Sequence, residues 1–391
     1  MVISTPYRKS MRSVLAWICL IAVLVVLIYE LGGLGLEPKF NLYDFVGYWS
    51  PGRLAVTGHN PYAPEQIIAL QKEIGKEKPG LQGFWYPPWT LTFLMPFGLL
   101  NYSAAATLWL TMHLALVFFS ADWIWRFYGG PKSHRWIAWI IPLLYYPTIY
   151  VLSIGQISIL ILFGIIGFLY FIKNRKGWLA GICIFLATIK PNLLYLFWMA
   201  FIFWVVDRRF WSALLGLGSA VLVALAVSLC VNSAVITHYA SADFPMFYWL
   251  TPTPGTLFRL LLGPDKTWLQ FISPILGAIW LLVYWTRHRR TWEWGEQMPM
   301  LLLMSLVTSF YSWGYDQVVL LVAVIQVAVL IFNRRKDRVT LWAIGSYLGI
   351  DILCLILPMN NAFWYIWLAP SILFWYWAVR KKLSCEGTVR M

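Results

Sequence analysis

Charged residues that could take part in chemistry are few in this 391-residue chain, because Asp, Glu, Lys and Arg make up only 12% of it. Four of them stand out because each lies at the end of an apolar segment, beside aromatic residues or proline: Asp44, Lys190, Arg259 and Asp316. Carboxylates are the groups of proton transfer, and lysine and arginine are the groups that bind anions. These residues are therefore the first candidates for a functional site.

Metal and cysteine chemistry are not indicated by the sequence. No Asp-x-Asp pair or other cluster of oxygen ligands is present, and the five cysteines show neither a CxxC motif nor a Cys/His ligand spacing. We therefore predict no metal site and no bound cofactor, and we expect no disulfide framework.

The composition excludes a soluble globular protein. Hydrophobic residues make up 60% of the chain, and its charged fraction is about half the roughly 25% typical of soluble proteins. The net charge of +14 could indicate nucleic acid as a partner, but the basic residues form short clusters between apolar runs. That arrangement is typical of membrane proteins. We therefore expect membrane lipids around the chain and no nucleic acid.

Apolar segments near the length of a membrane helix, about 20 residues, recur along the whole chain. They predict an all-α polytopic membrane protein of one domain, residues 1–391, with about twelve transmembrane helices. The fifth and sixth are short and are separated by Lys190-Pro191, so one kinked hairpin that does not fully cross is the alternative. The predicted spans are 14–34, 102–125, 136–153, 156–172, 177–190, 192–206, 210–232, 268–286, 298–313, 316–333, 339–357 and 362–379.

Basic clusters occur at every second connection between these spans. The first is Arg8, Lys9 and Arg12, and a later one is Arg380, Lys381 and Lys382. Because cytoplasmic loops carry the excess of Lys and Arg, both termini are predicted to be cytoplasmic, in a multi-pass protein of the plasma membrane. The first span is read as an uncleaved signal-anchor rather than a signal peptide, since no clear cleavage site follows it.

Two long connections, residues 37–88 and 233–267, then face outside, where loops on a rigid bundle are typical places for a site. The first is predicted to be partly helical. Asp44 is expected to cap a helix that runs through Ala55, and Pro64 is expected to begin a second helix that lies on the membrane surface. The apolar stretch 89–100 is short, and we expect it to re-enter the membrane rather than cross it.

Several motifs in this order resemble glycosyltransferase family 87, whose members are GT-C-type mannosyltransferases that use polyprenol-phosphate-mannose. The motifs are Asp44-Phe45 with Tyr48, Gly58-x-Asn60-Pro61-Tyr62, Tyr86-Pro87-Pro88 with Pro96, Gly155-Gln156, Ala180-Gly181 leading to Lys190-Pro191, and Ser309-Phe310-Tyr311-Ser312-Trp313 with Asp316. The last motif differs from the family at Phe310, where proline is usual, and it lacks the paired histidines that often follow.

The resemblance implies a GT-C-like bundle that moves a hexose, with mannose as the family's sugar, from a polyprenyl-phosphate-sugar to a lipid or glycan acceptor. The transfer would be inverting and would take place at the outer membrane face. The family's catalytic aspartate corresponds to Asp44, whose ordinary alternative is a helix cap. One carboxylate suffices for such a transfer, because it removes the proton of the acceptor hydroxyl while the leaving phosphate is already an anion.

The donor phosphate needs a cation, and without a cluster of metal ligands Lys190 and Arg259 are the candidates that bind it. Their alternative role is to reach the lipid headgroups. Six further residues are weaker candidates for binding substrate, and each has an ordinary role in helix capping, the interfacial aromatic belt or a loop: Gln156, Tyr86, Trp85, His59, His238 and Asp316.

Two other functions compete with sugar transfer from a lipid carrier. Twelve spans are also common in transporters and lipid or glycan flippases, but such proteins often contain repeated halves, and none is apparent here. Ligation of a preassembled glycan would also place basic residues in outer loops, and it differs by transferring a long chain rather than one sugar.

Overall fold

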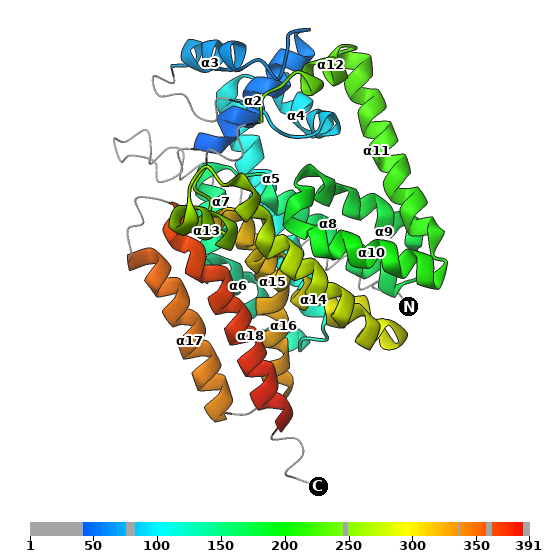
Figure 1. Ribbon diagram of the computed structural model, residues 1–391, viewed down its shortest axis with the longest axis vertical. Coiled ribbons are helices and arrows are strands. Elements are labelled where there is room, and N and C mark those ends of the chain that lie inside the picture. The colour runs from blue at the N-terminus through cyan, green and yellow to red at the C-terminus, as the bar shows by residue number, and fades with distance from the viewer. Residues whose placement is uncertain (1–41, 76–82, 245–248, 335–336, 357–361, 386–391) are drawn as a thin grey trace, which may run out of the picture. The chain divides into compact units, whose positions relative to one another are not determined.

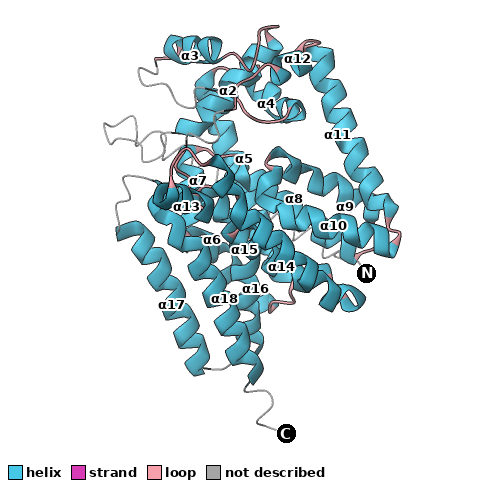
Figure 2. Cartoon of the chain, in the orientation of Figure 1, coloured by secondary structure: helices cyan, strands magenta, loops and turns pink. Residues whose placement is uncertain are grey.

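The computed structural model describes residues 42–75, 83–244, 249–334, 337–356 and 362–385, and every regular element within these ranges is a helix (Figures 1 and 2). The all-α prediction is therefore confirmed for this part of the chain. The predicted first span, 14–34, lies outside the described residues.

The chain divides into two compact units. Of the described residues, the first contains those up to Phe119 together with Leu152–Gln156 and Ser228–Ala240, and the second contains the others.

Among the described residues, six helices are long and apolar enough to cross a membrane, and the number rises to eight if each of two bent pairs counts as one span. The predicted count of twelve is thus not confirmed. One reason is length, because α8 (Ser158–Lys173) is apolar but short and α15 (Trp294–Val307) has 14 residues. The six are α5 (Tyr102–Phe127), α11 (Trp211–Val231), Thr267–Thr291 around α14 (Ile272–His288), Gly314–Arg334 including α16 (Leu321–Arg334), Arg338–Ile356 in α17 (Asp337–Ile356), and Ala362–Leu383 in α18 (Leu368–Cys385) with the turn before it.

The two bent pairs show where proline interrupts an apolar segment. α6 (Ile137–Leu144) and α7 (Tyr146–Ile154) meet at an angle of 69°, and Pro147 lies in the first turn of α7. A proline there lacks the N–H of a continuous helix and collides with the carbonyl four residues earlier. The segment was predicted as a single span, 136–153, so the bend is a correction.

The second bent pair joins Gly177–Ile189 to Pro191–Arg208, which contains α10 (Tyr195–Arg208), at an angle of 120°. The break falls at Lys190, whose backbone (φ −133°, ψ 72°) lies outside the α-helical region, which a residue before proline disfavours. The sharp bend agrees with the predicted alternative of one kinked hairpin.

In the first unit, α2 (Tyr43–Val56) packs closely against α4 (Leu91–Gly98). A Cβ added at Gly98 would meet the backbone of Gly52 in α2, so only glycine permits this approach. α4 is thus a short helix packed on α2. The predicted capping role of Asp44 is wrong, because Leu42 occupies the N-cap position and Asp44 lies inside the first turn.

The other elements of the predicted outer loops are also short. α3 (Pro64–Glu73) begins at Pro64 as predicted, and Gln71 near its end is fully buried. In the second predicted loop, α12 (Val235–Ala240) belongs to the first unit and α13 (Pro254–Leu262) to the second.

In the second unit, α8 is almost wholly buried and packs against α9 (Gly177–Ile184). Gly164 and Gly167 of α8 allow this contact, because an added Cβ at either would meet Cys183 of α9. Around Phe168 of α8, large aromatic rings fill the core: Phe197, Phe201 and Trp294.

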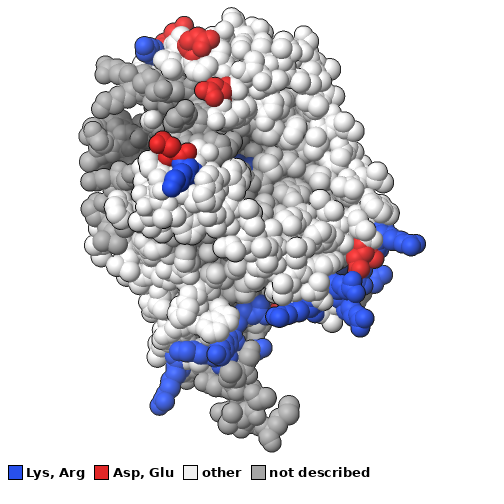
Figure 3. Space-filling view, in the orientation of Figure 1, with Lys and Arg blue, Asp and Glu red and all other residues white. Residues whose placement is uncertain are grey.

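Basic side chains of the second unit gather at one set of helix ends. The last turns of α10, α14 and α18 carry Arg208, Arg287 and Lys382, and Figure 3 shows lysine and arginine along the lower margin, where these helices end. Arg208 also donates hydrogen bonds of 3.0 Å to the carbonyls of Arg289 and Arg290. The ends of these helices therefore form a basic rim.

Candidate active site

Asp44 lies in the first unit, in the first turn of α2, and only 6% of its surface is exposed. Its Oδ2 accepts a 2.6 Å hydrogen bond from Nε2 of Gln156, which is 112 residues away in the sequence. The positive end of the helix dipole also favours a negative charge in this turn. Asp44 is thus a buried carboxylate whose orientation is fixed by a neutral amide.

Gln156 connects Asp44 to two tyrosines. Its Oε1 accepts a hydrogen bond from the hydroxyl of Tyr48, and that hydroxyl lies 2.9 Å from the hydroxyl of Tyr86. Both ends of the Gln156 side chain therefore bind protein groups. We accordingly interpret Gln156 as a residue that positions Asp44, rather than one whose amide is reserved for a sugar.

Trp109 of α5 forms a hydrogen bond with the backbone just before Gln156. Gly155 has a φ of +71°, a left-handed conformation that favours glycine, and its carbonyl accepts a 2.9 Å hydrogen bond from Nε1 of Trp109. His113 packs on Trp109 with a ring separation of 4.2 Å. The turn that presents Gln156 to Asp44 is therefore fixed by conformation and by packing.

Two further tyrosines of the first unit remain protonated, and burial is the main cause. Burial raises the pKa of Tyr62, with a smaller effect from Tyr239, so its hydroxyl remains a donor to the carbonyl of Tyr86 at 3.0 Å. Burial also raises the pKa of Tyr43, with a further contribution from the charge of Asp44. Neither phenol is thus a source of negative charge near Asp44.

Lys190 and Asp316 form a buried ion pair in the second unit. The Lys190 Nζ and Asp316 Oδ1 atoms are 2.8 Å apart, and the two side chains are 9% and 1% exposed. Ser158 bridges the pair, because its Oγ donates to Asp316 at 2.6 Å and accepts from Lys190 at 3.2 Å. The backbone N–H of Trp313 donates to the second carboxylate oxygen of Asp316 at 3.0 Å.

The ammonium group of Lys190 also lies 4.9 Å from the centre of the Tyr315 ring, within the range of a cation–π interaction. The structure thus brings together two residues that the sequence singled out separately. Lys190 was a candidate for phosphate binding, and Asp316 was a weaker candidate for substrate binding. What the arrangement offers chemically is a desolvated, oriented ammonium group whose charge is balanced by Asp316 and whose N–H groups can donate to an anion.

Arg259 lies on α13 of the second unit. Its Nε and Nη2 atoms both donate to the carbonyl of Pro264, each at 3.0 Å. α13 is anchored by buried polar residues, since Nε2 of Gln270 donates to the hydroxyls of Thr253 and Thr256 at 3.1 and 3.3 Å. Arg259 is therefore a partly exposed cation on a firmly held short helix.

The remaining predicted site residues lie in the first unit. His59 is exposed, and its Nδ1 lies 3.0 Å from the hydroxyl of Thr57. The His59 carbonyl accepts a hydrogen bond from Asn232, which precedes α12, the helix that carries His238. Trp85 is partly buried against Gly83. Among the described residues, no three His, Cys, Asp or Glu side chains come together as metal ligands.

Sequence reasoning missed the supporting residues of both clusters. Tyr48 was quoted as part of a motif without a role, and Ser158 and Trp109 were not singled out. Ser158 had one available signal, because it follows Gln156 by two residues at the start of a predicted span. Trp109 had none, since tryptophan is abundant in this chain.

These observations define a helical membrane protein with a buried carboxylate and a buried cation, each held by hydrogen bonds. The family model for glycosyltransferase family 87 matches residues 84–358, which is more than half of the chain and includes Gln156, Lys190, Arg259 and Asp316. The chain belongs to glycosyltransferase family 87 and is therefore a membrane glycosyltransferase, which uses a sugar donor and an acceptor. Neither a curated protein nor a solved structure matches the chain.

Proposed function

We propose that the enzyme transfers a hexose, with mannose as the expected sugar, from a polyprenyl-phosphate donor to a hydroxyl group of a lipid or glycan acceptor. The transfer inverts the anomeric centre. The observation that carries this proposal is the hydrogen-bonded series Tyr86, Tyr48, Gln156 and Asp44, which holds one carboxylate in one orientation. A single oriented carboxylate is what an inverting transfer to a hydroxyl requires.

In this mechanism Asp44 takes the proton of the acceptor hydroxyl, and the acceptor oxygen attacks the anomeric carbon of the donor. The bond between that carbon and the phosphate oxygen breaks, and its electrons leave with the polyprenyl phosphate. The phosphate is a stable anion and needs no proton from an acid. The Gln156 amide keeps the Asp44 carboxylate in place during the attack, because it binds the carboxylate without neutralising it.

The donor phosphate would be bound by Lys190 and Arg259. Lys190 suits this role because it is desolvated and held by Asp316 and Ser158, so little reorganisation is needed when an anion arrives. We propose that the reaction needs no metal ion. Transfer that continues in excess chelator would support this, and a requirement for Mg²⁺ or Mn²⁺ would contradict it.

The proposed site opens at the outer face of the plasma membrane, and both termini are cytoplasmic. The basic rim at the ends of α10, α14 and α18 supports this orientation, because lysine and arginine accumulate on the cytoplasmic side. Accessibility of single introduced cysteines to a membrane-impermeant thiol reagent in intact cells tests the orientation directly.

The experiment that tests the proposed base is Asp44→Asn in the full-length protein, reconstituted in lipid nanodiscs. The substrates are labelled polyprenyl-phosphate-mannose and a membrane lipid extract as acceptor, and released polyprenyl phosphate is measured. Asparagine keeps the size of the side chain and an acceptor for Gln156, so folding is preserved. We expect turnover to fall by about 10²–10⁴-fold, the usual contribution of a general base.

Glu65→Gln is the matched control, because Glu65 is an exposed carboxylate on α3 of the same unit. It should retain wild-type turnover. Full turnover by the Asp44 variant would show that another group is the base. Mass analysis of the product also separates transfer of one hexose from ligation of a preassembled glycan. Family membership already favours an enzyme over a transporter or flippase.

A further inference from the structure

A continuous row of aromatic rings runs through the described part of the second unit beside Lys190. Neighbouring ring centres in the row are between 5.4 and 6.5 Å apart, within the range of favourable aromatic contacts. We call it the aromatic row, and its members in spatial order are Trp249, Tyr311, Trp313, Tyr315, Tyr150, Tyr365 and Tyr146.

Segments far apart in the sequence build this row, and most of its rings are partly exposed. Trp249, Tyr311, Trp313, Tyr315, Tyr150 and Tyr146 are each intermediate in exposure, whereas Tyr365 is 7% exposed. A core aromatic cluster, such as the one around Phe168 in α8, is instead largely buried. The aromatic row is therefore a surface with accessible ring area, rather than part of the core.

The edges of the row are polar. The indole N–H of Trp313 donates to the hydroxyl of Tyr311 at 2.8 Å, and the hydroxyls of Tyr146 and Tyr365 are 2.6 Å apart. Each of these groups already has one partner in the protein, and a phenol hydroxyl can both donate and accept, so hydroxyl groups of a ligand gain hydrogen bonds here that a hydrocarbon chain does not make. A ligand with its own hydroxyl groups suits this surface better than an isoprenoid tail.

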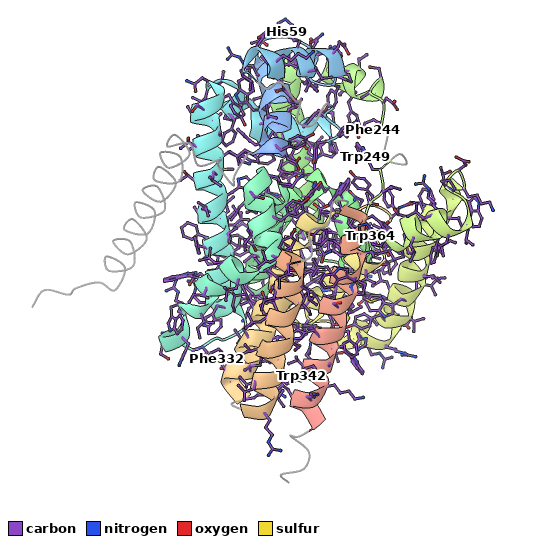
Figure 4. The ribbon with its side chains drawn as sticks, turned by 90° about the vertical axis from the view of Figure 1, so that its left-hand side faces the viewer. His59, Phe244, Trp249, Phe332, Trp342 and Trp364 are labelled. Atoms are coloured by element: carbon purple, nitrogen blue, oxygen red, sulfur yellow. The ribbon has the colours of Figure 1, made fainter. Side chains whose placement is uncertain are left out.

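The row passes the buried ion pair. The ring of Tyr315 lies under the ammonium of Lys190 at 4.9 Å, and Asp316 is the next residue in the chain. The side chain of Asn192 donates to the carbonyl of Tyr311 at 2.7 Å, which ties this part of the row to the segment after Lys190. In Figure 4, Trp249 lies well above Phe332 and Trp342, which are in the lower part of the same unit.

We propose that the aromatic row binds the acceptor, and that the acceptor is a carbohydrate whose pyranose rings lie on Trp249, Tyr311 and Trp313. This inference rests on the proposed function and names the class of acceptor. Tyrosine and tryptophan combine an apolar face with a polar edge, which matches a sugar ring with apolar C–H faces and a rim of hydroxyls. The proximity to Lys190 places such a chain beside the proposed donor phosphate.

The test measures binding without turnover, on the full-length protein in nanodiscs. The probes are fluorescein-labelled mannotriose, maltotriose and chitotriose, with farnesyl phosphate as the isoprenoid probe. We expect at least one trisaccharide to bind saturably, and Trp249→Ala and Trp313→Ala each to weaken that binding about tenfold. Trp313→Phe keeps an aromatic face and should stay within about threefold of wild type.

Trp342→Ala is the matched control, because Trp342 is a partly exposed tryptophan of the same unit whose ring contacts Lys382 instead of the row. It should bind the trisaccharide as wild type does. Trp249→Ala removes a loop residue with little risk to folding, so the test does not depend on Trp313→Ala alone. Saturable binding by none of the trisaccharides, or equal binding by wild type and both alanine variants, would overturn the proposal.

A third result would also overturn it. If Trp313→Ala weakened binding of farnesyl phosphate and left the trisaccharide unaffected, the row would hold the donor's isoprenoid chain. Asp44→Asn separates this inference from the proposed function, because it should lower transfer about 10²–10⁴-fold and leave trisaccharide binding intact. Wild-type transfer by that variant would contradict the proposed base but would leave the aromatic row as a binding surface.

Discussion

Replacing Lys190 by methionine separates the structural role of the buried ion pair from its proposed catalytic role. At 2.8 Å and an effective dielectric constant of about 20, the gross attraction between Lys190 and Asp316 is about 6 kcal/mol, much of which offsets desolvation. Removing one partner of a buried pair typically costs about 3–5 kcal/mol, because the remaining charge has no counter-charge. Ser158 and the Trp313 N–H still donate to Asp316, so we expect the lower part of that range.

The double variant Lys190→Met with Asp316→Asn is the informative comparison. It removes both charges. The asparagine oxygen can still accept from the Trp313 N–H, and its amide can donate to the Ser158 hydroxyl, which both donates and accepts. We therefore expect the double variant to recover at least about 2 kcal/mol of the loss. The free energy of unfolding is measured by titration with sodium dodecyl sulfate in mixed micelles. Equal stability of the single variant and wild type would refute the description of the pair as a buried, mutually dependent unit.

Turnover then tests the proposed function of Lys190. If Lys190 binds the donor phosphate, the double variant should remain impaired even though its stability is restored, and KM for the donor should rise. Wild-type turnover by the double variant would mean that Lys190 serves the fold alone. The two measurements move independently, so loss of folding cannot be mistaken for loss of phosphate binding.

Two glycines provide further predictions with matched controls. Gly98→Ala should lower the free energy of unfolding by about 1–3 kcal/mol, because its Cβ would meet the backbone of Gly52. In denaturant titrations, Gly218→Ala, where the space is open, should not destabilise the protein. Gly155→Ala forces a side chain into a left-handed turn, which costs about 1–2 kcal/mol, and its Cβ would also lie 2.7 Å from the Cβ of Phe45, so the total loss should be larger. Turnover should fall because Gln156 follows directly. Gly129→Ala has a similar φ of +77° and open space, so it should show the conformational cost without the loss of turnover.

Long apolar segments were predicted well because membrane thickness sets their length. The predicted spans 102–125 and 210–232 correspond to α5 and α11 within two residues at each end. Hydropathy reports only that a segment is apolar, so it could not tell a crossing helix from a short core helix such as α8. α8 is apolar all round because it is buried by protein, and this is why the count of twelve was not confirmed.

Prolines account for one helix break that the sequence predicted and for one that it did not. The break at Lys190-Pro191 was expected, since a charge and a proline lie between two short spans. The 69° bend between α6 and α7 was not expected. This segment contains two prolines, and in the structure Pro142 lies inside α6 without breaking it, whereas Pro147 coincides with the bend. A single sequence shows which positions can bend, and packing decides which of them do.

The candidate site was predictable as a set of residues and not as an arrangement. Asp44 and Gln156 are 112 residues apart, and Lys190 and Asp316 are 126 apart, so neither pairing follows from local pattern. A physical rule could have suggested the ion pair, because a charge in an apolar segment needs an opposite charge nearby. Asp122, inside a predicted span, obeys the same rule by pairing with Arg126 and Arg135.

The hydrogen bonds around Asp316 explain how Lys190 could serve both an ion pair and a phosphate. An ammonium group has three N–H donors, so it can bind Asp316 and a phosphate oxygen at the same time. If Lys190 turned toward the phosphate, Ser158 and the Trp313 N–H would still satisfy the Asp316 carboxylate. The cost of sharing the lysine is then smaller than the cost of breaking an isolated buried pair. A neutral pair plus a phosphate is nonetheless a net anion, and in the proposed mechanism Arg259 is the second cation that balances this charge.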